Sequence, residues 1–533
     1  MTGLEERARQ LRERHGGQPV GPARNLAHIA RQQAEADPDR VVIIDAEHRL
    51  TRAGMLDKAL RLGAALRQRG IGAGAAVAFQ LPNWWEACVI NLACALYGYR
   101  LVPLLTIYRR AELDEILPAC EVAAVFIPEA LGRTDYPALY ASLASPPAHI
   151  FTVRGEGDQF AALLQAEPGA PEPAPDDDAK MVLFTSGSTG HPKGVIHSHA
   201  SIAAIIEAGA ALWSIGPEDT FYVPSPIGHI GGSIYAFEFP WMTGCTTVLA
   251  ERWDPDLAVR EIEAHGATFM AGATPFLSGL IAAAGRAGTS LPSLRRFICG
   301  GASVPPELIR RGLDAFPGAV VSRAYGSSEI PILCPGIRSR DEAFRRADTD
   351  GEIAADLVVL DAAGRPVPEG MPGEIAAAAD RMFLGYLNPA DDVGAFTGDG
   401  RFLMGDLGRI VDGKYIQITG RTKDIIIRKG ENISPLEIEN ALARHPALRQ
   451  QSVVGVPDPE RGEMVVAVVV PKEGARFTFA DMIAHLEALG MAKQKFPERL
   501  EIVEALPMNS VGKVQKQALR ATLTQTGQPE GRA

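Results

Sequence analysis

The chain reads Thr185-Ser186-Gly187-Ser188-Thr189-Gly190-His191-Pro192-Lys193-Gly194 between two apolar segments, Met181–Thr185 and Val195–His197. Three glycines let the backbone approach a ligand closely, and four hydroxyls together with Lys193 can donate to phosphate oxygens. A plain turn between two strands is the simpler alternative for such a segment. The density of glycine, hydroxyl groups and lysine favours a phosphate-binding loop. The loop is not a Walker A motif, because that spacing requires glycine where Pro192 stands.

The segments around this loop alternate between strand-like and helix-like patterns. Strands are expected at residues 40–45, 75–81, 100–104 and 181–185, and helices at 51–69 and 84–98. Strands alternating with helices of this length indicate βαβ units and a largely parallel sheet. The fold class is therefore α/β. A stretch rich in proline and acidic residues, 167–178, is expected to be an exposed linker.

The C-terminal part has a different pattern. A polar break at residues 420–424 precedes Ser434-Pro435-Leu436-Glu437, in which Ser434 and Glu437 fit a capping box at a helix start. We expect a large N-terminal domain over residues 1–420 and a compact α+β domain over residues 421–533.

Bulk composition restricts the class of protein. The 533 residues exceed a single domain, and 46% hydrophobic with 22% charged residues is a globular composition. The net charge of -11 argues against a nucleic-acid partner. The cysteines form no CxxC pair, and neither an apolar leader nor an apolar run of about 18 residues occurs. We expect reduced thiols and a cytoplasmic protein without a membrane span.

The loop resembles the signature of the adenylate-forming superfamily, which includes acyl-CoA synthetases, adenylation domains of peptide synthetases and beetle luciferases. Further motifs of that family follow in order from about residue 25 to residue 516. The resemblance implies two distorted sheets and a small barrel-like subdomain in the large domain, with a mobile C-terminal lid. It also implies a ligase that uses ATP and Mg²⁺ to form an acyl-adenylate, and then transfers the acyl group to coenzyme A.

The resemblance assigns ATP-binding roles to several short segments. Tyr325-Gly326-Ser327-Ser328-Glu329 is similar to the family's Tyr-Gly-x-Thr-Glu, which implies adenine stacking by Tyr325, an α-phosphate contact by Ser328 and Mg²⁺ binding by Glu329. Asp406, in Met404-Gly405-Asp406, and Arg421 would bind the ribose, although Met404 replaces the family's threonine. The full ATP-binding set comprises Thr185, Ser186, Gly187, Ser188, Thr189, Gly190, Lys193, Gly301, Ala302, Tyr325, Gly326, Ser328, Asp406 and Arg421.

The C-terminal motifs are assigned in the same way. Lys513, in Pro507–Val514, matches the lysine that bridges the substrate carboxylate and the α-phosphate, although an isolated lysine would ordinarily be a surface residue. Lys423 matches the hinge of the lid, whose swing lets one site serve two reactions. Lys429, Gly430 and Glu431 resemble the loop beside the pantetheine tunnel of coenzyme A.

The segment Pro224–Gly232 resembles the wall of the acyl pocket. His229 matches a gating residue there, while a satisfied core histidine is the alternative. With Thr185, Glu329 and Lys513, it completes the residues expected to be catalytic. Ile230 stands where amino-acid-activating relatives carry aspartate, so a neutral hydrophobic acid is expected. Gly231 and Gly232 are expected to leave room for a bulky acyl group.

The motifs leave several functions open. The segment Pro224–Pro226, with Trp253–Pro255 and Gly272–Phe276, is similar to cyclohexanecarboxylate–CoA ligases and medium-chain synthetases. Aromatic, alicyclic, medium-chain and sterol side-chain acids all fit, and a homodimer is possible. An enzyme that loads a carrier protein, a luciferase-like oxygenase and a non-catalytic nucleotide-binding paralogue are alternatives. The short tail after residue 516 favours free coenzyme A over a fused carrier, and Lys513 argues against a mere binder.

Overall fold

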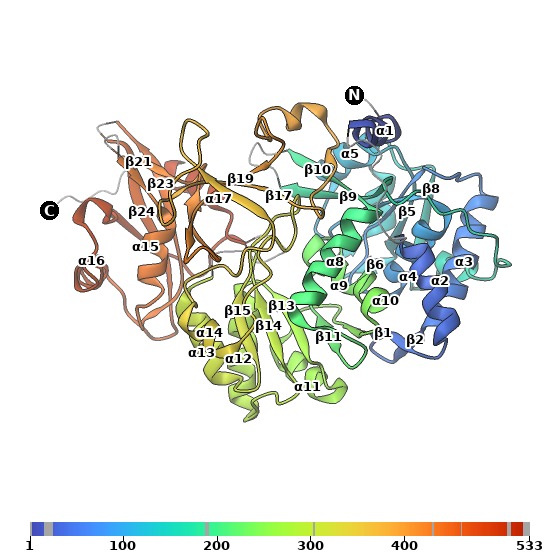
Figure 1. Cartoon of the computed structure of the whole chain (residues 1–533), viewed down its shortest axis with the longest axis horizontal. Helices are drawn as coiled ribbons and strands as arrows, with labels where there is room; N and C mark the ends of the chain where they lie inside the picture. The colour runs from blue at the N-terminus through green and yellow to red at the C-terminus, as the bar shows by residue number, and fades with distance from the viewer. Residues whose placement is uncertain are drawn as a thin grey trace.

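The structure is a computed structural model that describes residues 3–14, 25–186, 191–301, 304–428, 431–459, 461–508 and 513–525. Two large sheets form the body of the described molecule, and a smaller sheet joins them to a separate C-terminal sheet (Figure 1). The predicted α/β class is confirmed. The α1 helix (Leu4–Arg14) lies at the top of the right-hand half in Figure 1, near α5 and away from the C-terminal sheet.

The first large sheet carries the acyl-pocket motif on one of its connections. Its strand order is β15-β14-β13-β11-β12-β1-β2, and its strands are parallel except for the β1–β2 hairpin. The strands are β1 (Val41–Asp45), β2 (His48–Thr51), β11 (Thr220–Val223), β12 (Thr246–Leu249), β13 (Phe269–Gly272), β14 (Arg296–Cys299) and β15 (Val320–Arg323). Its outer face is covered by α11 (Pro255–His265), α12 (Thr274–Ala287), α13 (Pro306–Ala315) and α14 (Arg340–Arg345).

The second large sheet carries the glycine- and hydroxyl-rich loop. Its strand order is β18-β10-β9-β4-β3-β5-β8, with antiparallel pairing only at β9–β10 and β10–β18 among the described strands. The strands are β3 (Ala76–Phe79), β4 (Arg100–Pro103), β5 (Val122–Pro128), β8 (His149–Val153), β9 (Ala179–Ser186), β10 (Pro192–Ser198) and β18 (Gly385–Tyr386). Shorter elements complete it: α5 (Arg110–Ala119), β6 (Ala130–Leu131), β7 (Thr134–Asp135), α6 (Tyr136–Ala141) and α7 (Gln159–Leu163).

Helices that precede or connect strands of the two large sheets fill the space between these sheets. They are α2 (Leu26–Ala36), α3 (Arg52–Gln68), α4 (Trp85–Tyr97), α8 (His199–Trp213), α9 (Ile230–Phe237) and α10 (Phe239–Thr243), and they share one apolar core with strands of both sheets. The α4 helix is buried along almost its whole length, and it is mostly apolar, as expected of a helix between two layers. It ends at Gly98, whose φ of 67° is readily adopted by glycine.

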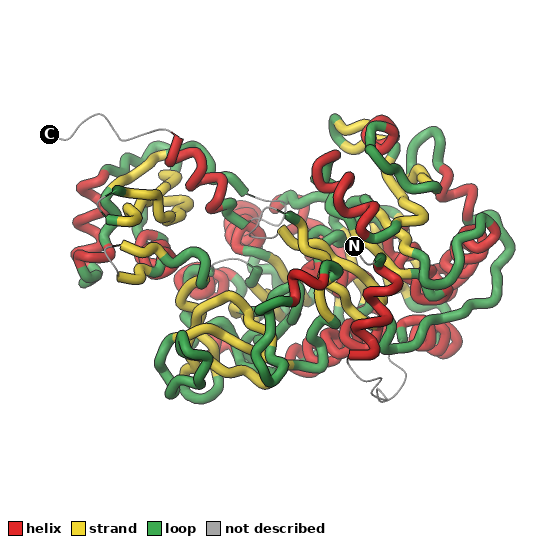
Figure 2. Tube along the Cα trace, turned by 90° about the horizontal axis from the view of Figure 1, so that it is seen from above, coloured by secondary structure: helices red, strands yellow, loops and turns green. Residues whose placement is uncertain are grey.

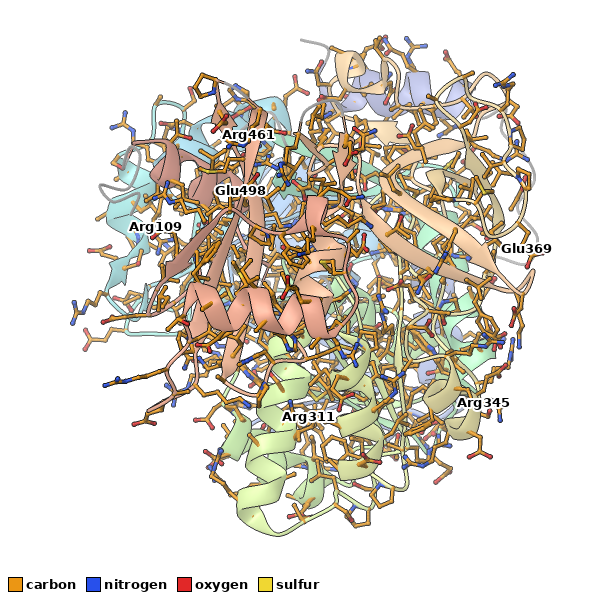
Figure 3. All side chains as sticks on the ribbon, turned by 90° about the vertical axis from the view of Figure 1, so that its left-hand side faces the viewer. Arg109, Arg311, Arg345, Glu369, Arg461 and Glu498 are labelled. Atoms are coloured by element: carbon orange, nitrogen blue, oxygen red, sulfur yellow. The ribbon has the colours of Figure 1, made fainter. Side chains whose placement is uncertain are left out.

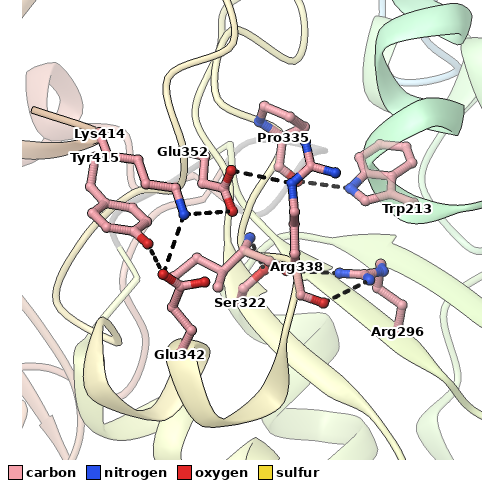
Figure 4. Close-up of polar contacts among 10 residues, drawn as sticks. Trp213, Arg296, Ser322, Pro335, Arg338, Glu342, Glu352, Lys414 and Tyr415 are labelled. Carbon is pink, nitrogen blue, oxygen red and sulfur yellow. Dashed lines mark hydrogen bonds and ion pairs between the residues drawn. The ribbon is translucent and has the colours of Figure 1, made fainter.

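The smaller sheet has the antiparallel order β16-β17-β19-β20. Its strands are β16 (Asp356–Leu360), β17 (Gly373–Ala378), β19 (Phe402–Val411) and β20 (Tyr415–Arg421), and the 3-10 helix η1 (Pro389–Asp392) precedes β19. Polar contacts bind it to the first large sheet (Figure 4). Lys414 Nζ, in the turn between β19 and β20, lies 3.3 Å from Glu342 Oε1 on α14, a helix that covers the first large sheet.

The C-terminal sheet has its own core. Its strands are β21 (Ile426–Arg428), β22 (Glu431–Ile433), β23 (Leu448–Asp458), β24 (Gly462–Pro471) and β25 (Arg499–Ile502), flanked by α15 (Pro435–Leu442), α16 (Phe479–Ala488), η2 (Lys493–Lys495) and α17 (Lys516–Gln525). Alternate residues of β24 face α15 with α16 on one side and α17 on the other, as a strand period of two requires. Arg461 and Glu498 mark this sheet in Figure 3. The tube view sets it apart from the large sheets (Figure 2).

Residues 167–178 form no helix or strand and none of them is buried, as predicted, and Asn25 donates to Ala174 O at 2.7 Å. The predicted capping box at Ser434 and Glu437 is wrong. Ser434 does begin α15, but its hydroxyl donates to the carbonyl of Thr419 and caps no helix amide. Glu437 pairs with Lys495 instead. The predicted division at residues 420 and 421 falls at the end of β20 and stays a prediction.

Candidate functional site

The β9–β10 hairpin presents Thr185 and Lys193 as register partners across the two strands. Lys193 Nζ lies 2.8 Å from Asp391 Oδ1 and 5.0 Å from the ring centre of Tyr386. Both members of the ion pair are about three-quarters buried. The loop residues Gly187, Ser188, Thr189 and Gly190, and the side chain of Ser186, lie outside the described residues.

The segment Tyr325–Glu329 crosses from the first large sheet toward this hairpin. Tyr325 pairs with Cys334 as an isolated antiparallel bridge, which folds the segment back on itself. Gly326 sits in the fold, where a Cβ would lie 2.7 Å from Ile332 N. The carboxylate of Glu329 accepts from Tyr386 Oη at 2.7 Å. Glu329 therefore lies beside the ring over which Lys193 is placed.

The backbone of this segment is held by a buried histidine. His197, at the end of β10, bonds through Nε2 to the carbonyl of Ser328 at 2.7 Å, and through Nδ1 to Ser201 Oγ at 3.1 Å. Burial lowers the pKa of His197 to about 4, so the ring is neutral. Because a carbonyl can only accept, the proton lies on Nε2.

The candidate ribose site is formed where β19 and β20 pair. Asp406 and Arg421 are register partners, and Arg421 Nε lies 2.9 Å from Asp406 Oδ1. The second carboxylate oxygen accepts from Tyr325 Oη at 2.8 Å. Burial raises the pKa of Tyr325 well above its usual value, and the charge of Asp406 adds to this shift. The Arg421 side chain is 62% exposed, so its hydrogen-bonding groups can still be reached by a ligand.

Lys513 comes from the C-terminal part and reaches this site. A Cβ added at Gly301 would lie 3.9 Å from Lys513 Cε, and Gly301 itself has a φ of 77°. Burial, together with the nearby cation of Arg421, lowers the pKa of Lys513 to about 8, although the charges of Asp406 and Glu329 oppose this shift. Gly301, the segment Tyr325–Glu329 and the paired strands β19 and β20 thus contribute the groups around this lysine.

His229 lies at the start of α9, where its Nδ1 accepts from the backbone of Gly231 at 3.0 Å. The ring therefore caps the helix, and its proton must lie on Nε2. The atoms packed around the ring lower its pKa to about 3, although part of its surface is exposed, and the Lys513 cation contributes. A neutral imidazole with Nε2–H is a hydrogen-bond donor at neutral pH.

The glycines after His229 do not both leave space. A Cβ at Gly232 would lie 2.4 Å from the carbonyl oxygens of Ser225 and Pro226. The prediction that Gly232 makes room for a bulky acyl group is therefore wrong, because the turn before α9 already fills that space. At Gly231 the nearest atom is His229 Nδ1, 3.3 Å from the added Cβ. The Ile230 side chain is buried.

The remaining predicted residues lie at the edge of this arrangement. Lys423 is exposed between β20 and β21, and Glu431 is exposed at the start of β22. Ala302, Lys429 and Gly430 lie outside the described residues. The sequence reasoning missed Tyr386 and Asp391, which contact Glu329 and Lys193. The available signal was an aromatic residue directly after Gly385, followed in the next turn by the acidic pair Asp391-Asp392, but this segment lies far from the loop in the sequence.

The residues present fit a Mg²⁺ ion carried by a nucleotide. Among the described residues, no group of three or more His, Cys, Asp or Glu side chains could hold a metal. A single carboxylate such as Glu329 is nevertheless sufficient, because Mg²⁺ is commonly held by one or two carboxylates together with substrate phosphates.

Comparison with known proteins agrees with this geometry. Residues 30–387 match the family model described as AMP-binding enzyme, and residues 437–513 match its C-terminal domain. The medium-chain fatty-acid–CoA ligase of Escherichia coli K12 is 33% identical over 521 residues, which cover 93% of this chain and 90% of the relative. A salicylyl-CoA synthase / salicylate adenylyltransferase from a Streptomyces species is 30% identical, with 93% of each covered.

The same agreement extends to solved structures. ATP-bound MatB from Rhodopseudomonas palustris superposes with a TM-score of 0.83 at 27% identity, covering 95% of this chain and all of that one. Within the described residues, no helix combines the length and apolar character needed to cross a membrane. The matched family models, the order of the motifs and the arrangement of the sheets all agree. The chain therefore belongs to the AMP-binding enzyme family.

Proposed function

We propose that this protein is an ATP-dependent ligase that joins a carboxylic acid to coenzyme A through an acyl-adenylate. The placement of Lys513 carries the proposal. A lysine from the C-terminal part sits beside Gly301, within electrostatic reach of Asp406, Arg421 and Glu329. A protein that only binds nucleotide has no need of such a cation, whereas adenylation builds negative charge between a carboxylate and a phosphate.

In the first reaction the substrate carboxylate attacks the α-phosphorus of ATP. A bond forms between a carboxylate oxygen and the α-phosphorus. The anhydride bond between the α- and β-phosphates breaks, and pyrophosphate leaves. Thr185 and Lys193 neutralise and orient the leaving phosphates, and Ser328 and Lys513 contact the reacting centre. Asp406 and Arg421 hold the ribose. Glu329 would hold Mg²⁺, which supplies charge neutralisation to the phosphates when it is bound.

In the second reaction the thiol of coenzyme A attacks the acyl carbon. A carbon–sulfur bond forms, the bond to the phosphate oxygen breaks, AMP leaves and the thiol proton passes to solvent. Lys513 has to withdraw to admit the thiol, with Lys423 as the hinge and Lys429, Gly430 and Glu431 beside the incoming pantetheine. The neutral His229 gates this path as a hydrogen-bond donor.

The substrate is a hydrophobic acid of the aromatic, alicyclic or medium-chain class. The relatives support this range, since one is named for medium-chain fatty acids and another for salicylate. Ile230 offers no charge to an amine, because its buried side chain is apolar. We place the enzyme in the cytoplasm, with Mg²⁺ bound to ATP.

Separate assays of the two half-reactions test the proposal. In Lys513→Ala, acid-dependent exchange of labelled pyrophosphate into ATP should fall by at least about 100-fold, as expected for loss of a charge that stabilises a transition state. Thioester formation from supplied acyl-adenylate should remain largely intact. Equal loss in both half-reactions would contradict the role of Lys513. A panel of acids graded by length and ring size identifies the substrate, and a flat response would contradict the acid–CoA ligase.

A further inference from the structure

The α1 helix is attached to the second large sheet by more than apolar packing. Leu4, Ala8 and Leu11 are buried in a cluster shared with β9, β10 and the residues that flank β18. Arg7 lies between them on the helix and is itself only 6% exposed. An arginine buried at an otherwise apolar contact is costly unless a charged partner and hydrogen bonds satisfy it. Its partners are therefore informative.

Those partners all belong to the segment that contains β18 and η1. Arg7 Nε donates to the carbonyl of Tyr386 at 2.9 Å, and the guanidinium forms an ion pair with Asp392. The other oxygen of Asp392 accepts from the backbone N–H of Tyr386 at 2.9 Å. Arg7 thus holds the carbonyl of Tyr386 and Asp392 holds its N–H, although Tyr386 lies 379 residues after Arg7 in the sequence. Figure 1 shows α1 beside β10 at this edge of the sheet.

The enclosed segment holds two groups of the phosphate site. The hydroxyl of Tyr386 donates to Glu329 at 2.7 Å, and Lys193 lies over its ring. Asp391, next to Asp392, pairs with Lys193 Nζ at 2.8 Å. The segment has little sheet pairing to fix it, because β18 has only two residues. A segment held by so few ladder bonds needs other contacts to keep its side chains in place.

We propose that Arg7 is a positioning residue for the ATP phosphate site, and that α1 is thereby part of the adenylation machinery. Arg7 fixes Tyr386 and Asp392, and these place Tyr386 Oη on Glu329 and Asp391 on Lys193. This inference rests on the roles proposed above for Glu329 and Lys193. It predicts that loss of the Arg7 guanidinium alters how ATP and Mg²⁺ are bound, while leaving the step that uses coenzyme A unaffected.

The test compares Arg7→Gln with two variants of the same helix in the full-length protein. Arg12→Gln removes a half-exposed guanidinium that lies 3.5 Å from Asp177 and 4.0 Å from Asp178, away from β18 and η1. Leu4→Ala loosens the apolar packing of α1 but keeps Arg7. For each variant we measure pyrophosphate–ATP exchange against ATP and Mg²⁺ concentration, thioester formation from supplied acyl-adenylate, and the thermal midpoint.

Arg7→Gln should raise KM for ATP and the Mg²⁺ concentration for half-maximal exchange by about tenfold, a typical effect of losing a group that orients a ligand-binding residue. Its thioester step should stay within twofold of the unaltered protein. Arg7→Lys should recover part of the loss, because an ammonium can still pair with Asp392. Tyr386→Phe should show the same Mg²⁺ effect, because it removes the hydroxyl from Glu329.

Three outcomes overturn this inference. In the first, pyrophosphate–ATP exchange by Arg7→Gln depends on ATP and Mg²⁺ as in the unaltered protein. In the second, Arg7→Gln loses both half-reactions to the same extent. In the third, Arg7→Gln and Leu4→Ala behave identically. If Arg7→Gln does not fold, Tyr386→Phe decides the question, and a normal Mg²⁺ dependence in that variant overturns the inference. Absence of acid-dependent exchange in the unaltered protein would instead overturn the proposed function itself.

Discussion

At the scale of single residues, we expect the protonation of Lys513 to set the pH dependence of the first reaction. Its pKa is lowered by burial to about 8, so the cation is present at neutral pH and is lost as the pH rises through 8. We therefore expect kcat/KM for ATP, measured by pyrophosphate exchange from pH 6 to pH 10, to decline above about pH 8. This ratio reports the ionisation of the free enzyme, before ATP phosphates can raise the lysine pKa.

Lys513→Arg is the matched control for this profile. A guanidinium stays protonated throughout the range, so the alkaline decline should disappear even if the maximum rate is lower. If Lys513→Arg showed the same alkaline decline, the decline would have to come from the ionisation of another group. His229 should add no acidic limb near pH 6.5, because its pKa lies near 3.

At the scale of secondary structure elements, a buried ion pair joins the strand of the phosphate loop to the helices of the acyl segment. Lys180 on β9 lies 2.7 Å from Glu238 Oε1 at the junction of α9 and α10, and each side chain is 3% exposed. Lys180 Nζ also donates to Asn91 on α4 at 2.7 Å. This contact fixes β9 relative to α9, and therefore the phosphate loop relative to His229.

Lys180→Met should destabilise the protein by about 3–5 kcal/mol, because it leaves Glu238 buried and uncompensated. The double variant Lys180→Met with Glu238→Leu should regain most of that loss, since no buried charge remains. Chemical denaturation measures both. A single variant as stable as the unaltered protein, or a double variant worse than the single one, contradicts this account.

The turn before α9 makes a second prediction at this scale. Gly232→Ala places a methyl group 2.4 Å from the carbonyl oxygens of Ser225 and Pro226, and should cost about 1–3 kcal/mol as the turn shifts. Gly285→Ala in α12 is the control, because no atom lies within 4 Å of its added Cβ. That change should stabilise the helix by about 0.5–1 kcal/mol. The two thermal midpoints should move in opposite directions, and equal shifts would contradict the crowding at Gly232.

At the scale of the whole molecule, the C-terminal part is placed so that Lys513 lies beside Gly301 of the large domain. This arrangement suits the first reaction, and the proposed hinge at Lys423 has to change before the thiol can enter. Lys423→Pro restricts the backbone there. We expect pyrophosphate exchange to persist in this variant, while thioester formation falls by at least about tenfold.

Lys423→Ala is the control for the hinge, because it removes the same side chain without restricting the backbone. It should retain both half-reactions. Equal losses of the two half-reactions in Lys423→Pro would show that the substitution disturbs the fold rather than the motion. Stopped-flow measurement of each half-reaction separates these results.

The sequence by itself determined the α/β class, the early strands and helices, and the order of the motifs. These features are local: strand and helix periods, and short motifs such as Tyr325–Glu329, record which side chains are buried or polar within a few residues. Conversely, the capping box at Ser434 and Glu437 failed because both side chains found partners outside their own helix.

Only the tertiary structure decided which distant residues meet. Three contacts depend on how the connections run through space: Lys513 lies beside Gly301, Arg7 binds Tyr386, and Ser225 crowds Gly232. A periodic pattern shows that Arg7 lies on a buried helix face, but it contains no information about the partner. The reason is physical: the free energy of a buried ion pair or a close backbone contact depends on the surrounding atoms, and only the folded chain brings those atoms together.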